Sequence, residues 1–88
     1  MEEANVIYSD LRAAMDKGVE SPEVQQIIGR WHQHINYFYE PSVERLRGLG
    51  WAYANDPAFA AFYEKIDPDM PQFISRAIVI YCDNLSSD

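Results

Sequence analysis

The sequence predicts an all-α protein, a single small domain of about five short helices. Apolar residues recur at intervals of three and four along most of the chain, which is the spacing of one helix face. No stretch alternates apolar and polar residues as a half-buried strand does. Pro22 and Pro57 each follow a residue type that caps helices. A chain of 88 residues has room for one domain, so we expect residues 1–88 to form a single unit.

The first two helices are predicted from residues 3–39. The first runs from Glu3 to Lys17 before Gly18, with a thin apolar stripe of Ile7, Leu11, Ala14 and Met15. Because it lies at a chain terminus, we expect residues 1–18 to be mobile and residues 20–85 to form the core. The second begins at the cap Ser21 and runs to Tyr39, where Pro41 ends it. Its stripe consists of Val24, Ile27, Ile28, Trp31, Ile35 and Phe38.

Three further helices follow. Ser42 is predicted to cap a third helix, in which Gly48 and Gly50 either weaken the helix or allow a bend or a close helix crossing. Its expected inward residues are Val43, Leu46, Leu49, Gly50 and Tyr53. A short helix opens at Asp56-Pro57, with Phe59, Phe62, Tyr63 and Ile66 facing inward. The last helix has the clearest stripe in the chain, from Met70 through Phe73, Ile74, Ala77, Ile78 and Tyr81 to Leu85.

Charge and composition exclude several classes of function. The net charge is -7, with fourteen acidic and seven basic residues and no basic cluster. Such a surface cannot neutralise phosphates, so we expect no nucleic-acid binding by this chain and no attraction to anionic membranes. A single cysteine, Cys82, excludes an internal disulfide. Since neither a signal peptide nor a transmembrane run is recognisable, we expect a cytoplasmic protein.

Aromatic residues give the strongest functional indication. Nine of the twelve lie between Trp31 and Tyr63. They suit either a core rich in rings or the wall of a cleft for a flat apolar ligand. The stripes favour a core position for Trp31, Phe38, Phe59, Phe62, Phe73 and Tyr81. Four rings fit the stripes less well and are expected to be partly exposed: Tyr37, Tyr39, Trp51 and Tyr53. With His34 at the edge of the cleft and with Trp31 and Phe38, they form the candidate ligand-binding set.

The sequence does not favour catalysis or metal binding. His32 and His34 are two residues apart and face different sides of a helix, whereas a metal-binding pair needs a spacing of three or four. No residue near Cys82 is suited to lower the pKa of its thiol. Spacing supports no triad of nucleophile, base and acid. We therefore expect no catalytic residues, no metal site and no cofactor.

The order of several short motifs resembles a known family. Trp31-His32 and Phe38-Tyr39 are followed by Leu49-Gly50, then by Tyr53-Ala54-Asn55-Asp56-Pro57-Ala58-Phe59 and Tyr63-Glu64-Lys65. Met70-Pro71-Gln72-Phe73 then leads into Arg76-Ala77-Ile78-Val79-Ile80-Tyr81. This series, which covers roughly residues 20–84, resembles the TipAS antibiotic-recognition domain, the drug-sensing module of bacterial TipA-type MerR transcription regulators.

The resemblance implies a globin-like helical packing with a cleft for bulky hydrophobic antibiotics, often peptide-derived. It also implies that the domain is either fused to a DNA-binding half or a free-standing drug-binding relative, and that it is a possible homodimer. The family's drug-capturing cysteine aligns with Glu40-Pro41-Ser42 here, so noncovalent binding is expected. An alternative from the residues alone is a protein–protein interaction or dimerisation module with no small-molecule ligand.

Overall fold

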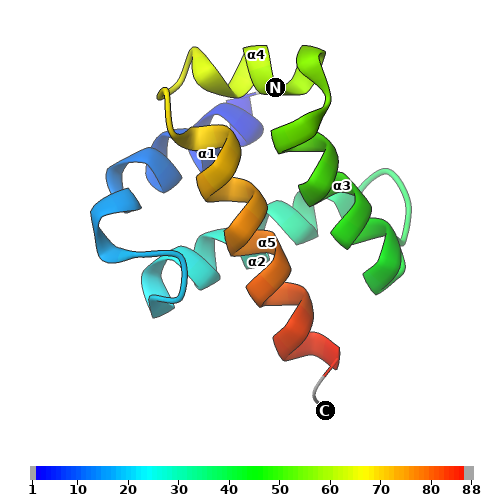
Figure 1. Cartoon of the computed structure of the whole chain (residues 1–88). Coiled ribbons are helices and arrows are strands. Elements are labelled where there is room, and N and C mark those ends of the chain that lie inside the picture. Colours follow the sequence, from blue (N-terminus) through cyan, green and yellow to red (C-terminus); the bar gives the residue numbers. More distant parts are fainter. Residues whose placement is uncertain (1, 87–88) are drawn as a thin grey trace.

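The computed structural model describes residues 2–86 and confirms the predicted all-α fold (Figure 1). It contains no strand within that range. The elements are α1 (Glu2–Ala13), the 3-10 turn η1 (Met15–Lys17), α2 (Pro22–Asn36), α3 (Val43–Asn55), α4 (Pro57–Glu64) and α5 (Met70–Ser86).

Three helices begin at the caps that the sequence predicted. Ser21 Oγ accepts a hydrogen bond from the backbone N–H of Val24 at 3.2 Å. Ser42 Oγ accepts one from Arg45 N–H at 3.1 Å, and Asp56 Oδ1 one from Ala58 N–H at 2.9 Å. Each cap satisfies a backbone donor that the first helical turn leaves free.

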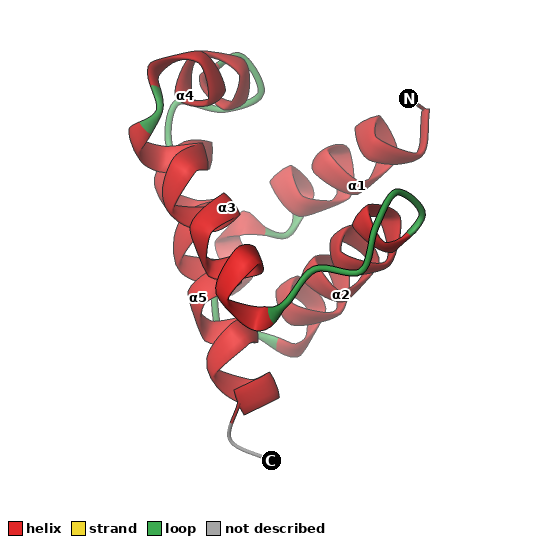
Figure 2. Ribbon diagram, turned by 90° about the vertical axis from the view of Figure 1, so that its right-hand side faces the viewer, coloured by secondary structure: helices red, strands yellow, loops and turns green. Residues whose placement is uncertain are grey.

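The helices form two packed pairs, which meet where α2 packs on α5. The most extensive pairing is between α3 and α5, and α1 packs mainly on α2 (Figure 2). The short helix α4 contacts α3 and α5 at one end of that pair. Figure 2 shows α1 and α2 side by side, with α4 facing the N-terminal half of α1 from the opposite side of the molecule.

The buried core draws on all five helices. Leu11, Ile28, Leu46, Ile74 and Ile78 are fully buried at its centre. The thin stripe predicted for the first helix does face inward, since Leu11 and two other α1-side residues, Ile7 and Ala14, are buried. Ile7, Leu11 and Ala14 therefore contribute to the core, while the mobility expected for residues 1–18 stays a prediction.

The first two helices end earlier than the sequence predicted. The chain turns into η1 after Ala14, and Gly18 closes it with φ of 97°, a backbone conformation that glycine adopts without strain. The helix α2 ends at Asn36 rather than Tyr39, and the backbone continues in turns. Phe38 consequently leaves the stripe of α2. It is 75% exposed, so its predicted core position was wrong.

The short helix α4 buries fewer rings than predicted. Tyr63 is its one buried residue, whereas Phe59 and Phe62 are exposed and Ile66 is half-buried. A helix of two turns buries only one face, which Tyr63 occupies. Phe59 and Phe62 lie at the edge of that face, where Phe59 contacts the ring of Tyr53 on α3 but stays exposed on its other side. Their predicted inward position was wrong.

Gly50 allows the close crossing of α3 and α5. A Cβ atom at this position would lie 2.9 Å from Ile78 Cγ2, closer than side chains tolerate, and 3.1 Å from Ile78 Cβ, which is tighter than most such contacts. Ile78 is β-branched and cannot swing away by rotating a distal bond. Gly48, half a turn away, would have nothing within 4 Å of such an atom. Of the two roles considered for these glycines, the close crossing applies to Gly50.

Substituting the two glycines by alanine should therefore have opposite effects. Gly50→Ala should lower the free energy of unfolding by about 1–3 kcal/mol, because the new methyl overpacks the contact with Ile78. Gly48→Ala should raise it by about 0.5–1 kcal/mol, because alanine favours the helix and meets open space. Urea unfolding of both variants measures this. Equal effects in the two variants would show that the crossing does not require a glycine.

Candidate functional site: an aromatic pocket between α1 and α4

A pocket of about 480 Å³ opens between α1 and α4. Its walls come from α1, the end of α3 and α4, and the residues that line it are Ala4, Tyr8, Tyr53, Ala58, Phe59, Phe62 and Tyr63. Every lining residue is alanine or an aromatic residue, although the chain as a whole carries a charge of -7. Such a lining suits an apolar, ring-containing molecule.

The rings of the pocket belong to a network that reaches the core. Tyr53 lies at its centre, with ring centroids 6.2 Å from Trp31, 5.3 Å from Phe59 and 4.8 Å from Tyr63. Tyr63 in turn meets Tyr8 edge-on at 5.2 Å. Most of these pairs are edge-to-face, the arrangement that aromatic quadrupoles favour. The network therefore joins the buried Trp31 to rings at the surface of the pocket.

The tyrosine hydroxyls in this network are hydrogen-bonded and uncharged. The hydroxyls of Tyr8 and Tyr63 lie 2.9 Å apart, and Trp31 Nε1 donates to Tyr53 Oη at 3.4 Å. Burial raises the pKa of Tyr8, Tyr53 and Tyr63 above the ordinary tyrosine value. All three hydroxyls thus stay protonated at neutral pH, which makes them donors.

The pocket continues as a groove along α1. A second cavity of about 310 Å³ shares Tyr8 and Phe62 with the first. A third, of about 610 Å³, shares Arg12 with the second and is lined further on by Asp16 and Asp67. The lining of the groove therefore changes from aromatic near the N-terminus of α1 to charged near its C-terminus.

Only two of the residues predicted to bind a ligand lie in the aromatic network of the pocket. Trp31 and Tyr53 lie in the aromatic network, and Tyr53 is the one that lines the pocket. Tyr53 is only 7% exposed, so the expectation that it is partly exposed was wrong; the rings of Trp31, Phe59 and Tyr63 cover it.

The other predicted residues lie on the surface away from this pocket. His34 packs against Tyr37 and Phe38 at the end of α2, with centroid distances of 6.3 Å and 5.6 Å. Tyr39 lies under the Arg45 guanidinium, 5.7 Å from its carbon. Trp51 is 65% exposed on α3. The exposure expected for Tyr37, Tyr39 and Trp51 is confirmed, while their contact with a ligand stays a prediction.

Of the seven residues that line the pocket, the sequence predicted only Tyr53 as a ligand contact. Tyr8 lies beside the stripe of α1, where its spacing predicts no special role, and Phe59 and Phe62 were predicted to lie in the core. One signal was present in the sequence. The segment Pro57–Glu64 carries three rings within eight residues, more than one face of two helical turns can bury.

The histidines and the other polar groups form no metal site within residues 2–86. No group of three or more His, Cys, Asp or Glu side chains lies close enough there to hold an ion. His32 instead shares a hydrogen bond of 2.8 Å between its Nδ1 and the Tyr81 hydroxyl. Burial lowers the pKa of His32, which favours the neutral ring in that pair. None of the described helices is long and apolar enough to cross a membrane.

Comparison with known proteins identifies the family. The model of the TipAS antibiotic-recognition domain matches residues 1–81. The chain belongs to the TipAS family. No solved structure matches it significantly.

Two transcription regulators contain segments similar to this chain. The HTH-type transcriptional activator mta of Bacillus subtilis is 33% identical over 85 residues, which cover 96% of this chain and 33% of that protein. The HTH-type transcriptional regulator SkgA of Caulobacter vibrioides is 35% identical over 81 residues, covering 88% of this chain and 32% of SkgA. The chain spans about a third of the length of these relatives.

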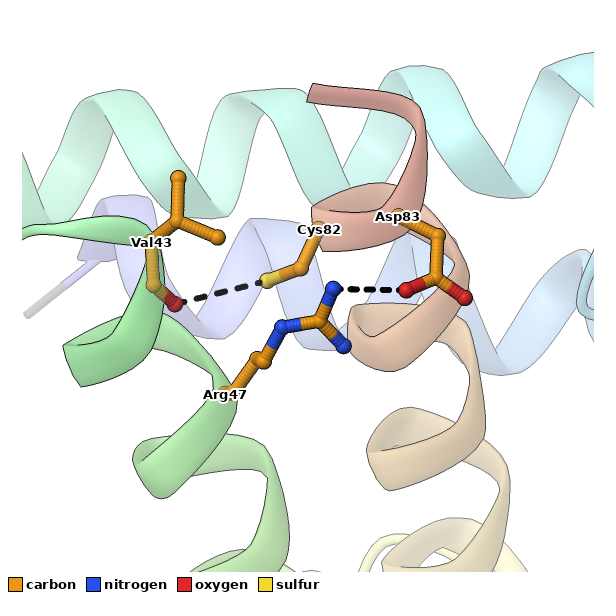
Figure 3. A network of polar contacts seen from close by, with 4 residues as sticks. All are labelled: Val43, Arg47, Cys82 and Asp83. Carbon is orange, nitrogen blue, oxygen red and sulfur yellow. Dashed lines mark hydrogen bonds and ion pairs between the residues drawn. The ribbon is translucent and has the colours of Figure 1, made fainter. Parts of the chain in front are cut away.

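The single cysteine of this TipAS domain is inaccessible. Cys82 is 0% exposed, and its thiol points to the backbone carbonyl of Val43 at 3.9 Å (Figure 3). The nearby ion pair between Arg47 and Asp83, at 2.6 Å, joins α3 to the end of α5. Burial raises the pKa of the Cys82 thiol, and the Arg47 guanidinium only partly offsets this. The thiol is thus protonated and shielded at neutral pH.

We expect Cys82 to resist alkylation and to form no adduct with a thiopeptide. Iodoacetamide at pH 8 should modify the folded domain far more slowly than the domain in urea, because the folded thiol is both covered and protonated. Intact mass spectrometry measures both, and Cys82→Ser serves as the unreactive control. A stoichiometric adduct on the folded protein that Cys82→Ser abolishes would contradict the prediction.

The buried tyrosines should make the domain sensitive to alkali. Their pKa values are raised in the folded state, so they stabilise the fold fully below pH ~10, where unfolded tyrosines ionise. Above that pH the unfolded chain loses protons that the folded chain keeps, and the free energy of unfolding should fall. Urea unfolding at a series of pH values should show a shallower alkaline fall in Tyr63→Phe than in the unmodified protein. An identical fall in both would mean that other groups are responsible.

Proposed function

We propose that this TipAS domain is the sensing part of a MerR-type transcription regulator, or a free-standing drug-binding relative of one. It binds a bulky, largely apolar antibiotic or other xenobiotic. The observation that carries the proposal is the ring-lined pocket between α1 and α4, in a chain whose relatives are named as transcription regulators. Such a domain acts in the cytoplasm and performs no catalysis.

In this proposal, a part of the regulator outside residues 1–88 contacts the DNA. The relatives carry about two thirds of their length outside the segment that this chain matches, and they are described as HTH-type. The chain itself has a net charge of -7, which opposes approach to the phosphate backbone. We therefore assign ligand sensing, and no direct contact with nucleic acid, to residues 1–88.

Binding would be signalled through α1. This helix packs mainly on α2, and it reaches α4 through side chains such as the Tyr8 hydroxyl on Tyr63. The second link, between Arg12 and Asp67, spans 3.8 Å on an exposed surface and adds little. A ligand in the pocket adds contacts to α1 and α4 at once. The ligand binds the state in which α1 is ordered more tightly than the state in which α1 is not. This difference in affinity shifts the population toward the ordered state and carries the signal.

Exposed rings support a second candidate function, a protein–protein interface. Tyr37, Phe38 and Trp51 all expose most of their surface, and Tyr39 stacks on Arg45 nearby in sequence. Aromatic residues and arginine are enriched at interfaces. In this reading, a second copy of the chain or another part of the regulator covers these exposed rings.

A thermal-shift screen with thiopeptides and other large hydrophobic drugs tests the proposal. A ligand that binds only the folded domain raises its melting temperature with free ligand concentration. For a compound that does so, Phe62→Ala should weaken binding by about 1–3 kcal/mol in a calorimetric titration, because it removes a ring from the wall of the pocket. Phe62 is exposed, so this truncation opens no core cavity.

Trp51→Ala is the matched control and tests the surface rings. It removes an exposed ring that the pocket does not contain, so affinity should stay unchanged. Loss of affinity in Trp51→Ala but not in Phe62→Ala would place the ligand on the surface predicted from the sequence. Hydrogen exchange adds a further readout: the Leu11 amide should gain protection with ligand, while that of Ile78 should change little.

A further inference from the structure

The aromatic pocket contains hydroxyl groups on its buried side. Three of its lining residues are tyrosines, Tyr8, Tyr53 and Tyr63. Tyr63 is 2% exposed and Tyr53 is nearly as buried, so bulk water hardly reaches their hydroxyls. A buried hydroxyl favours a partner for its proton, and a molecule that enters the pocket must either supply that partner or leave the proton unpaired.

The hydroxyls of Tyr63 and Tyr8 form a hydrogen-bonded pair at the wall of the pocket. They lie 2.9 Å apart. The pair brings two protons, and the hydrogen bond between the two hydroxyls uses one of them. Behind the pair, Trp31 Nε1 donates to Tyr53 Oη, and an indole N–H only donates, so it cannot accept a tyrosine proton. One proton of the pair is therefore not used by the bond between them.

Tyr8 is best placed to offer that proton to a ligand. It is half-buried, whereas Tyr53 and Tyr63 are buried, and it lines both the aromatic pocket and the adjoining cavity. Its ring also meets Phe62 edge-on at 5.9 Å, so a flat molecule held by these rings lies beside its hydroxyl.

We propose that the pocket selects uncharged, flat aromatic molecules that present a carbonyl oxygen to the hydroxyl of Tyr8. This inference rests on the proposed function, since it names the ligand class of the same pocket. A carbonyl accepts the remaining proton, whereas a hydrocarbon of the same shape buries it unpaired. A cation is disfavoured because no charged residue lines this pocket to compensate for its lost hydration.

Three probes of one shape test the proposal: 1-indanone, which carries the carbonyl, indane, which lacks it, and 1-aminoindane, which is cationic at neutral pH. Titrations followed by two-dimensional ¹H–¹⁵N NMR of the full chain give the dissociation constants, and shifts at Tyr8 and Tyr63 amides locate the site. We expect 1-indanone to bind about tenfold more tightly than indane, as one neutral hydrogen bond implies, and 1-aminoindane to bind most weakly.

Substitutions test whether the preference for 1-indanone over indane depends on the Tyr8 hydroxyl. Tyr8→Phe keeps the ring, which still covers the hydroxyl of Tyr63, and should bring the ratio between 1-indanone and indane close to one. The double variant Tyr8→Phe/Tyr63→Phe removes both hydroxyls and should leave no preference. Tyr39→Phe, a hydroxyl removed outside the pocket, should keep the full ratio. Phe62→Leu should weaken both probes equally.

The outcomes separate this inference from the proposed function. Equal binding of 1-indanone and indane at the pocket, or a ratio that persists in the double variant, overturns the inference and leaves the pocket as a binding site. Tightest binding of 1-aminoindane overturns it as well. If no probe shifts the amides of α1 and α4, the pocket does not bind flat apolar molecules, and both the inference and the placement of the ligand fail.

Discussion

The contact between Gly50 and Ile78 is the constraint on which the remaining structure depends. It brings the backbone of α3 against the side chain of α5 in the most extensive helix pair of the domain. Three residues after Gly50, the same helix places Tyr53 under α4, where it meets Tyr63 and Phe59. The position of α3 against α5 thus sets the depth of Tyr53, and with it one wall of the pocket. A wider crossing would move that wall and leave its rings without partners.

Two parts of the domain with different packing meet at the pocket. Tyr53 and Tyr63 are buried and belong to the rigid side formed by α3, α4 and α5. Tyr8 comes from α1, which packs chiefly on α2. The binding site of a sensor benefits from this arrangement. The wall formed by Tyr53 and Tyr63 is preorganised, which limits the entropy lost on binding. The wall formed by α1 can shift between conformational states when a ligand adds contacts to Tyr8.

The sequence predicted the helices better than the site. Caps such as Ser21 and Asp56 are local, because a side chain satisfies a donor only two or three residues away, and they correctly placed the starts of the helices. Periodicity likewise identified the core stripe of α5. The exposure of Phe38 and the burial of Tyr53 depended on where α2 ends and on which rings meet across helices. The spacing of residues along one segment predicts neither the end of α2 nor the ring contacts between helices.

The pocket was the least predictable feature, because it is made by contacts of high sequence separation. Tyr8 and Tyr63 are 55 residues apart and share a hydrogen bond. Nothing near Tyr8 in the sequence distinguishes it from an ordinary residue on the edge of an amphipathic stripe. Its importance follows from its contact with Tyr63, a buried residue of α4, because this contact brings the Tyr8 hydroxyl to the wall of the pocket. A polar group of the pocket is in this way positioned by a residue on another helix, which no reading of single segments could connect.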